Sequence, residues 1–122
     1  LIKKKIIICD RFVDSTIAYQ VHGKKVDINF INNIHEKILQ GVTPNIVFIL
    51  KVSIESSLKR LKKRKTKNRY DNFPQSFYNK AQKSFIKLAK NKKNYFILNS
   101  SLNDNSLENK IFNITKKYLK IR

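Results

Sequence analysis

Two charged residues, Asp10 and Arg11, stand directly after a short apolar run at residues 6–9. That run is rich in β-branched side chains, which predicts a buried strand of a parallel sheet. Ligands of open α/β sheets bind just beyond the carboxyl ends of the strands. This carboxylate and guanidinium therefore mark a candidate site, and the residues from Asp14 onward can begin a helix beside it.

A second candidate group is the dense basic run at residues 59–69. Phosphoryl transfer depends on charge neutralisation and alignment more than on covalent chemistry. Arginines that gather around the transferring phosphoryl group can lower the barrier strongly, and this run supplies Arg60, Arg64 and Arg69. Taken alone, the run fits a solvated basic helix end equally well.

The first group of residues also has a purely structural interpretation. Asp10 and Arg11 could pair with each other at the strand end, and Ser15 could cap the following helix. Tyr19 could be a core aromatic residue of that helix. The elements that position these side chains therefore matter as much as the residue types.

Apolar runs and helical patterns alternate along the chain. Strands are predicted at residues 6–9, 46–52 and 95–98, and helices at residues 14–20, 28–40, 54 onward, 75–90 and 107 onward. Asp27, Ser53 and Ser106 are the expected N-caps of three of these helices. The alternation predicts a parallel sheet with right-handed helical crossovers. Three strands would leave apolar faces poorly covered, so missing N-terminal strands are expected.

Composition narrows the class of protein. The chain has 122 residues and no Met, which suits one compact domain or part of a larger one. We expect a fragment that lacks its N-terminal part, or a processed N-terminus. The single Cys9 excludes an intrachain disulfide and fits a reducing cytosol. No apolar run approaches membrane-spanning length.

The net charge of +19 and a sequence pI near 10.2 predict attraction to polyanions. Two interpretations compete: a nucleic-acid binder, or a phosphate-handling enzyme from an organism with heavy use of Lys, Asn and Ile. Much of the lysine falls on helix faces that are expected to be solvated, so charge alone does not choose between them.

Residues 10–20 resemble the Asp-Arg-Tyr segment of bacterial thymidylate kinases, which follows an apolar strand in that family. The matching residues are Asp10, Arg11, Ser15, Ala18, Tyr19 and Gln20, and Phe12 replaces the commoner Tyr. These enzymes are P-loop nucleoside monophosphate kinases that move the γ-phosphoryl group of ATP onto dTMP. The resemblance therefore implies a phosphotransferase that uses ATP and Mg²⁺.

Residues 58–71 resemble the lid of the same family, where a Leu-Lys-Arg helix leads through a basic loop to Asp-Arg-(Phe/Ile)-Glu. Here Asn68 replaces the Asp and Asp71 replaces the Glu. By this match the lid covers about residues 60–71. Arg64 and Arg69 are its candidate arginines, and Arg60 is expected to be structural.

The resemblance also implies roles for the first motif. Asp10 would organise Mg²⁺ through water, and Arg11 would hold the dTMP phosphate. Thr16 would lie near the thymine edge, Tyr19 would pack against the sugar C2′, and Gln20 would line the nucleoside pocket. The implied substrate-binding group is Arg11, Ser15, Thr16, Tyr19 and Gln20, and the implied catalytic group is Asp10, Arg11, Arg64 and Arg69.

On the ATP side, the loop with Asn99 and Ser100 corresponds to the adenine-side loop of the family, and Arg64 would also contact ATP. Lys51 departs from the family, in which many members have Asp at that strand end. The chain has no Gly-x-x-x-x-Gly-Lys-(Ser/Thr) loop and only two glycines, Gly23 and Gly41. The phosphate cradle of the family is therefore expected upstream of this segment.

The expected fold is α/β: a three-layer, P-loop NTPase-like parallel sheet flanked by helices, with residues 1–122 as a single, partial kinase domain. The expected protein is a cytoplasmic thymidylate kinase that acts on dTMP and ATP, forms a homodimer, has no membrane segment and does not bind nucleic acid. The fragment alone is expected to be inactive. The alternatives are a deoxynucleoside kinase, which would act on thymidine, and a basic nucleic-acid-binding module.

Overall fold

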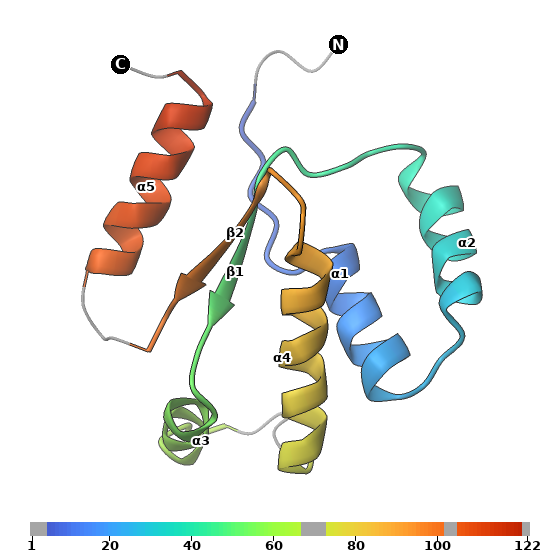
Figure 1. Ribbon diagram of the computed structural model, residues 1–122, viewed down its shortest axis with the longest axis vertical. Coiled ribbons are helices and arrows are strands. Elements are labelled where there is room, and N and C mark those ends of the chain that lie inside the picture. The colour runs from blue at the N-terminus through green and yellow to red at the C-terminus, as the bar shows by residue number, and fades with distance from the viewer. Residues whose placement is uncertain (1–4, 67–72, 102–104, 121–122) are drawn as a thin grey trace.

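The computed structural model describes residues 5–66, 73–101 and 105–120. Six helical segments and two strands alternate along these residues (Figure 1). In chain order they are α1 (Val13–Thr16), η1 (Ile17–Gly23), α2 (Ile28–Leu39), β1 (Val47–Lys51), α3 (Ile54–Lys62), α4 (Gln75–Ala89), β2 (Tyr95–Asn99) and α5 (Ser106–Tyr118). The chain therefore has the α/β character that its pattern predicts.

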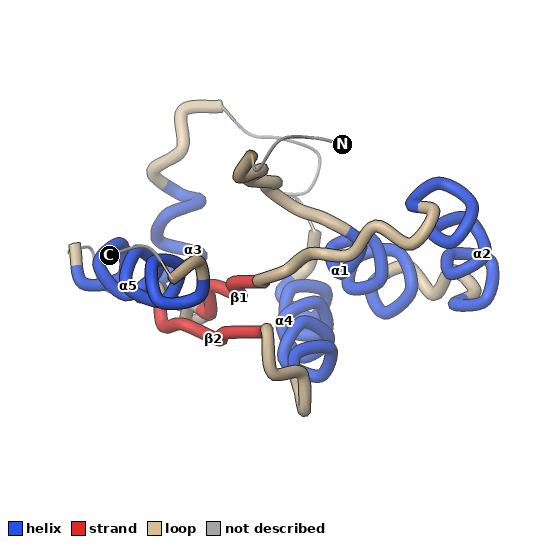
Figure 2. The backbone as a smooth tube through the Cα atoms, turned by 90° about the horizontal axis from the view of Figure 1, so that it is seen from above, coloured by secondary structure: helices blue, strands red, loops and turns tan. Residues whose placement is uncertain are grey.

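The two strands form a parallel pair, with Val47 opposite Tyr95 and Lys51 opposite Asn99. The chain passes from β1 through α3 and α4 before it returns as β2. Figures 1 and 2 show α4 and α5 on opposite sides of the strand pair. This arrangement brings the carboxyl ends of β1 and β2 to the same edge of the sheet, which is where parallel sheets bind ligands.

The predicted first strand is wrong for the described residues. Residues 6–9 run in an extended path toward α1 but belong to no strand, and Ile6, Ile7 and Ile8 are 65%, 78% and 92% exposed. A strand needs hydrogen bonds from a neighbour, and the described part of the chain supplies none to this segment. The sheet consequently has two strands instead of the three that we expected.

Two predicted helix caps, Asp27 and Ser53, are confirmed, and the third is wrong, because Ser106 is the first residue of α5 and Asn105 is its N-cap. The Asp27 carboxylate accepts a hydrogen bond of 2.8 Å from the Phe30 N–H at the start of α2. The Ser53 hydroxyl accepts one of 3.1 Å from the Ser56 N–H at the start of α3. Each cap satisfies a backbone donor that the first turn of a helix leaves unpaired.

The helix that carries the first motif is longer than predicted and changes character along its length. It begins at Val13, and η1 is a π-helical stretch that runs from Ile17 to Gly23. Helix α4 packs against η1, and the buried residues Ala18, Phe77 and Ala81 come from these two helices. A β-carbon on Gly23 would lie 2.5 Å from Cε2 of Phe77, so only glycine allows this approach.

No helix among the described residues has the length and apolar character that a membrane span requires.

Candidate functional site

The segment that joins residue 9 to α1 is held in a strained backbone conformation. Arg11 has a φ angle of 66°, in the left-handed region that a residue with a β-carbon seldom adopts. This conformation costs about 1–2 kcal/mol. The Cys9 thiol donates a hydrogen bond of 3.3 Å to the Arg11 carbonyl and helps to fix the bend. The Asp10 and Arg11 side chains are exposed as a result.

The Arg11 guanidinium lies over the ring of Tyr19, with its carbon 5.3 Å from the ring centroid. This is the geometry of a cation–π interaction. The fold therefore brings together two of the predicted substrate-binding residues, one from the bend and one from η1. The guanidinium remains exposed while its position is restricted by the ring.

Tyr19 also belongs to the interface between η1 and α4. Its ring centroid lies 5.8 Å from that of Phe77 and 6.0 Å from that of Phe85. The structural interpretation of Tyr19 is therefore supported in part, because its ring packs in this interface but is only half-buried. It is compatible with a ligand contact, because the same side chain is half-buried and lines a cavity.

The other predicted residues of this helix, Ser15, Thr16 and Gln20, are half-buried. The backbone N–H of Ser15 donates a hydrogen bond of 2.9 Å to the Phe12 carbonyl, and no side-chain cap is present at the start of α1. Ser15 therefore does not act as the side-chain cap that we considered.

Asp14 is a member of this region that the sequence reasoning missed. It is buried in the first turn of α1. Burial, followed by a hydrogen bond to Asp14 and the charge of that residue, raises the pKa of the Tyr95 phenol well above its ordinary value. Lys92 Nζ also donates a hydrogen bond of 3.3 Å to the Tyr95 hydroxyl. The hydrogen bond between Asp14 and Tyr95 connects the start of α1, and with it the Asp10–Arg11 bend, to the start of β2.

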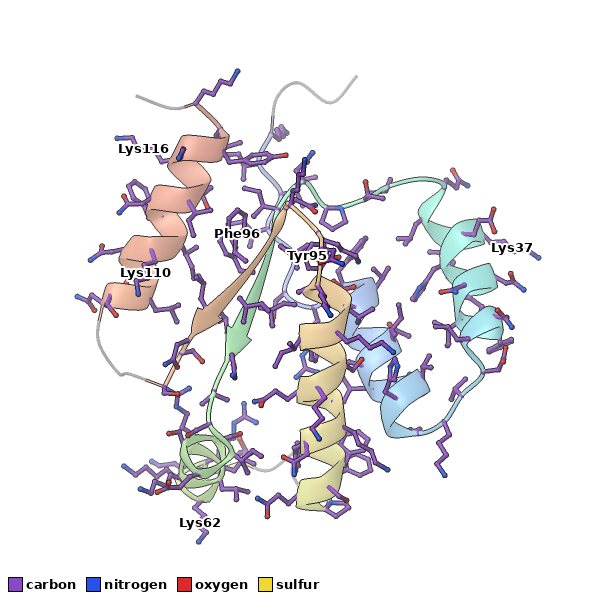
Figure 3. All side chains as sticks on the ribbon, viewed as in Figure 1. Lys37, Lys62, Tyr95, Phe96, Lys110 and Lys116 are labelled. Atoms are coloured by element: carbon purple, nitrogen blue, oxygen red, sulfur yellow. The ribbon has the colours of Figure 1, made fainter. Side chains whose placement is uncertain are left out.

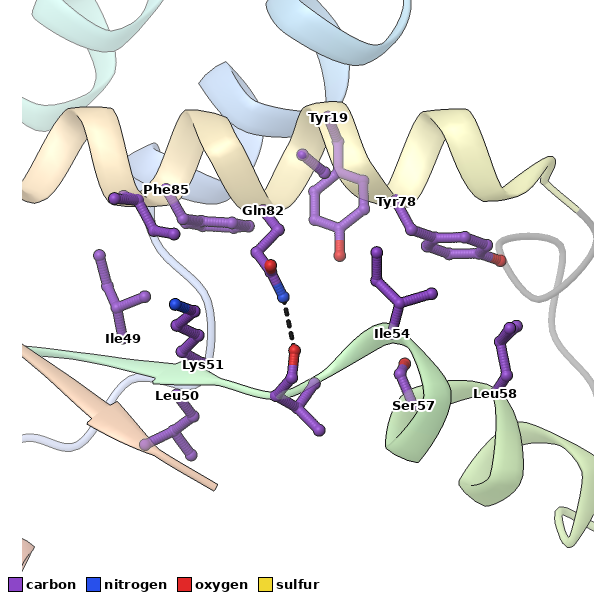
Figure 4. A pocket seen from close by; sticks show the side chains of 13 residues that line it. Tyr19, Ile49, Leu50, Lys51, Ile54, Ser57, Leu58, Tyr78, Gln82 and Phe85 are labelled. Carbon is purple, nitrogen blue, oxygen red and sulfur yellow. Dashed lines mark hydrogen bonds between the residues drawn. The ribbon is translucent and has the colours of Figure 1, made fainter. Parts of the chain in front are cut away.

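A cavity of about 170 Å³ lies at the carboxyl end of β1, between that strand, α3 and α4 (Figure 4). Its walls include Tyr19, Lys51, Ser57, Tyr78, Gln82 and Phe85. Nε2 of Gln82 donates a hydrogen bond of 2.6 Å to the Val52 carbonyl, which fixes this amide against the strand end. The cavity thus combines aromatic walls with a few polar groups, as small-molecule sites commonly do.

The predicted adenine-side loop is tied to the end of β1. The N–H and the hydroxyl of Ser100 both donate to the Lys51 carbonyl, at 2.7 and 3.2 Å. Arg60 donates a hydrogen bond of 2.6 Å to the Ser100 carbonyl, which confirms its structural role. The Asn99 side-chain oxygen accepts a hydrogen bond of 2.9 Å from the Ser101 N–H. Ser100 is buried, so a contact with ATP through its hydroxyl stays a prediction.

The predicted lid is described only in its first part. Arg64 follows the end of α3 and is exposed, whereas Asn68, Arg69 and Asp71 lie outside the described residues.

The described surface is strongly basic. Lysines point outward from α2, α3 and α5, as Lys37, Lys62, Lys110 and Lys116 illustrate in Figure 3. Within the described residues the only ion pair joins Lys59 and Glu55, at 2.8 Å. Most positive charge on these helices is therefore solvated instead of gathered at the candidate site. The described residues also contain no cluster of three potential metal ligands.

Comparison with known proteins gives a consistent result. A sequence profile of the family described as thymidylate kinase matches residues 1–111. The thymidylate kinase of Wolbachia pipientis wMel is 44% identical over 89 residues, which cover 73% of this chain and 43% of that protein. The thymidylate kinase of Aster yellows witches'-broom phytoplasma (strain AYWB) is 37% identical over 122 residues, or 97% of this chain and 56% of that protein.

The thymidylate kinase of Mycoplasmopsis pulmonis (strain UAB CTIP) is 34% identical over 122 residues, which cover 97% of this chain and 52% of that protein. The chain thus spans about half the length of the curated relatives that it matches.

Proposed function

The chain belongs to the thymidylate kinase family, and from this premise we propose that the complete protein transfers the γ-phosphoryl group of ATP to dTMP. The observation that carries the proposal is the contact between Arg11 and Tyr19, with 5.3 Å between the guanidinium carbon and the ring centroid. A guanidinium binds phosphate through two parallel hydrogen bonds. A tyrosine ring beside it offers an apolar surface for a sugar.

In this proposal Arg11 holds the dTMP phosphate and Tyr19 packs against the deoxyribose. Gln20, Thr16 and Ser15 face the nucleoside from the same helical segment. Their half-buried positions support this role, because such side chains are close to a ligand and still restricted by packing. The strained Arg11 backbone also supports it, since strain of this kind tends to persist at functional sites.

Asp10 would act on Mg²⁺ through bound water. Mg²⁺ keeps several waters and takes few protein carboxylates along with substrate phosphates, so one exposed carboxylate at the bend suits it. When bound, the ion would neutralise charge on the phosphates of ATP. Arg64 and Arg69 would add positive charge at the transferred group from the lid, and Asn99 and Ser100 would contact the adenine side of ATP.

We further propose that the chain is a partial kinase domain. The ATP phosphate cradle and additional strands of a three-layer, P-loop NTPase-like sheet would lie in a part of the protein outside this sequence. The exposed Ile6, Ile7 and Ile8 support the proposal, because they form the apolar strand pattern but pair with no described neighbour. Cytoplasmic location and a homodimer are parts of the same proposal.

The test is a steady-state assay of the complete protein with Mg-ATP and dTMP, dUMP or thymidine as acceptor. We expect the highest kcat/KM with dTMP, and Arg11→Ala should lower it by about two orders of magnitude or more. Lys110→Ala, which removes an exposed charge from α5, is the matched control and should keep full activity. Faster turnover of thymidine than of dTMP would replace this proposal by a deoxynucleoside kinase. Equal turnover of other nucleoside monophosphates would refute the choice of dTMP.

A further inference from the structure

Lys51 is the charged residue of the cavity at the end of β1. Figure 4 shows its side chain directed from β1 toward α4, beneath Phe85 and Gln82, and the Tyr19 hydroxyl pointing toward the strand from the opposite wall. The residues that line the cavity include no Asp or Glu. Among the residues that the structure describes, Lys51 forms no ion pair. The cavity therefore offers an ammonium group without a protein carboxylate to neutralise it.

The backbone that carries Lys51 is firmly held. Lys51 pairs with Asn99 in the sheet, and its carbonyl accepts two hydrogen bonds from Ser100. The neighbouring carbonyl of Val52 is fixed by Gln82. The base of the side chain is thus preorganised, which lowers the entropic cost of using its ammonium group to bind a ligand.

The volume of the cavity limits what can enter it. About 170 Å³ is less than the roughly 300–1,000 Å³ of sites that hold a whole small molecule. One part of a nucleotide fits better than a complete one. An ammonium group at the mouth favours the anionic part, because lysine binds phosphate as a point charge.

We propose that Lys51 binds a phosphoryl oxygen at this cavity and favours phosphorylated over unphosphorylated nucleosides. This inference rests on the proposed function and adds a specificity-determining residue to it. Arg11 and Lys51 would then both act beside Tyr19, because Arg11 lies over the tyrosine ring and Lys51 lines the same cavity as that ring. The phosphoryl group could belong to dTMP or to ATP, and the experiment distinguishes the two.

The experiment measures dissociation constants of the complete protein for dTMP, thymidine and ATP by isothermal titration calorimetry. Lys51→Met, which keeps the apolar stem, should weaken binding of dTMP or of ATP about tenfold, or 1.4 kcal/mol, and leave thymidine unchanged. Whichever nucleotide loses affinity is the source of the phosphoryl group. Lys51→Arg should retain most of the affinity, and Lys110→Met is the matched control for the lost charge.

Unchanged dTMP and ATP affinities in Lys51→Met would overturn the inference. Circular dichroism checks that each variant is folded, and Lys51→Gln replaces Lys51→Met if that variant is not. If Arg11→Ala loses dTMP binding while Lys51→Met does not, the inference fails and the proposed function stands. If the wild-type protein binds neither dTMP nor ATP but binds inorganic pyrophosphate in a Lys51-dependent way, the anion site stands and the proposed function fails.

Discussion

Replacing Gly23 by alanine tests whether η1 and α4 are as closely packed as the structure indicates. The added β-carbon would lie 2.5 Å from Cε2 and 3.0 Å from Cζ of Phe77. This ring cannot swing away easily, because it is buried and its centroid stacks 4.3 Å from that of Phe73. The helices must separate or the ring must leave its favoured position, which costs roughly 1–3 kcal/mol.

The expected net effect is smaller than the steric cost alone. Alanine is more favourable than glycine in a helix by up to about 1 kcal/mol. We therefore expect Gly23→Ala to lower the free energy of unfolding by about 1 kcal/mol. For a chain of this size that is a decrease in Tm of roughly 3–6 °C, measured by circular dichroism at 222 nm.

A second substitution shows whether the clash is the cause. Phe77→Leu removes the ring atoms that the alanine meets, so the penalty of Gly23→Ala should disappear in that background. Gly41→Ala is the control: its φ of 82° makes alanine unfavourable, but no atom lies within 4 Å of the new β-carbon. Its penalty should persist beside Phe77→Leu. A higher Tm for Gly23→Ala than for the wild type would refute the packing argument.

Two further substitutions test the remaining contacts. Asp27→Ala should destabilise α2 by about 1 kcal/mol, because it removes the acceptor for the Phe30 N–H. Urea unfolding measures this loss of stability. The control Asp27→Asn should retain most of the stability. Tyr95 has a raised pKa in the folded protein, so its contribution to stability is complete below its unfolded pKa near 10 and decreases as the pH rises above that value. Denaturant unfolding near pH 8 and pH 10.5 should therefore show a loss of stability that Tyr95→Phe reduces, and an equal loss in both proteins would contradict the proposed linkage.

Local features of the fold were predictable from the sequence, and features set by distant contacts were not. The caps at Asp27 and Ser53 depend on residues three positions away, and both were identified correctly. The strands β1 and β2 are continuous apolar runs with clear ends. Residues 6–9 have the same pattern, but a strand also requires a hydrogen-bonding neighbour, which no local pattern supplies.

The same distinction between local features and distant contacts holds for the candidate site. Arg11 and Tyr19 were both predicted as substrate-binding residues, but their contact was not, because it depends on the bend at Arg11 that turns the guanidinium over the ring. The hydrogen bond between Asp14 and Tyr95 joins residues far apart in the sequence, and neither residue type predicts which residue it will contact. From the sequence alone, Lys51 was an unexplained departure from the Asp that many family members have at this strand end. Its place in a cavity depends on how α4 packs beside β1, which the local sequence does not show.

The left-handed backbone at Arg11 has a consequence for how this position can evolve. Glycine would adopt a φ of 66° without steric cost, so selection for stability alone favours losing the side chain. In the proposed mechanism the guanidinium is indispensable, so selection for activity favours keeping it. In that mechanism, an arginine held where the backbone favours glycine exchanges stability for chemistry.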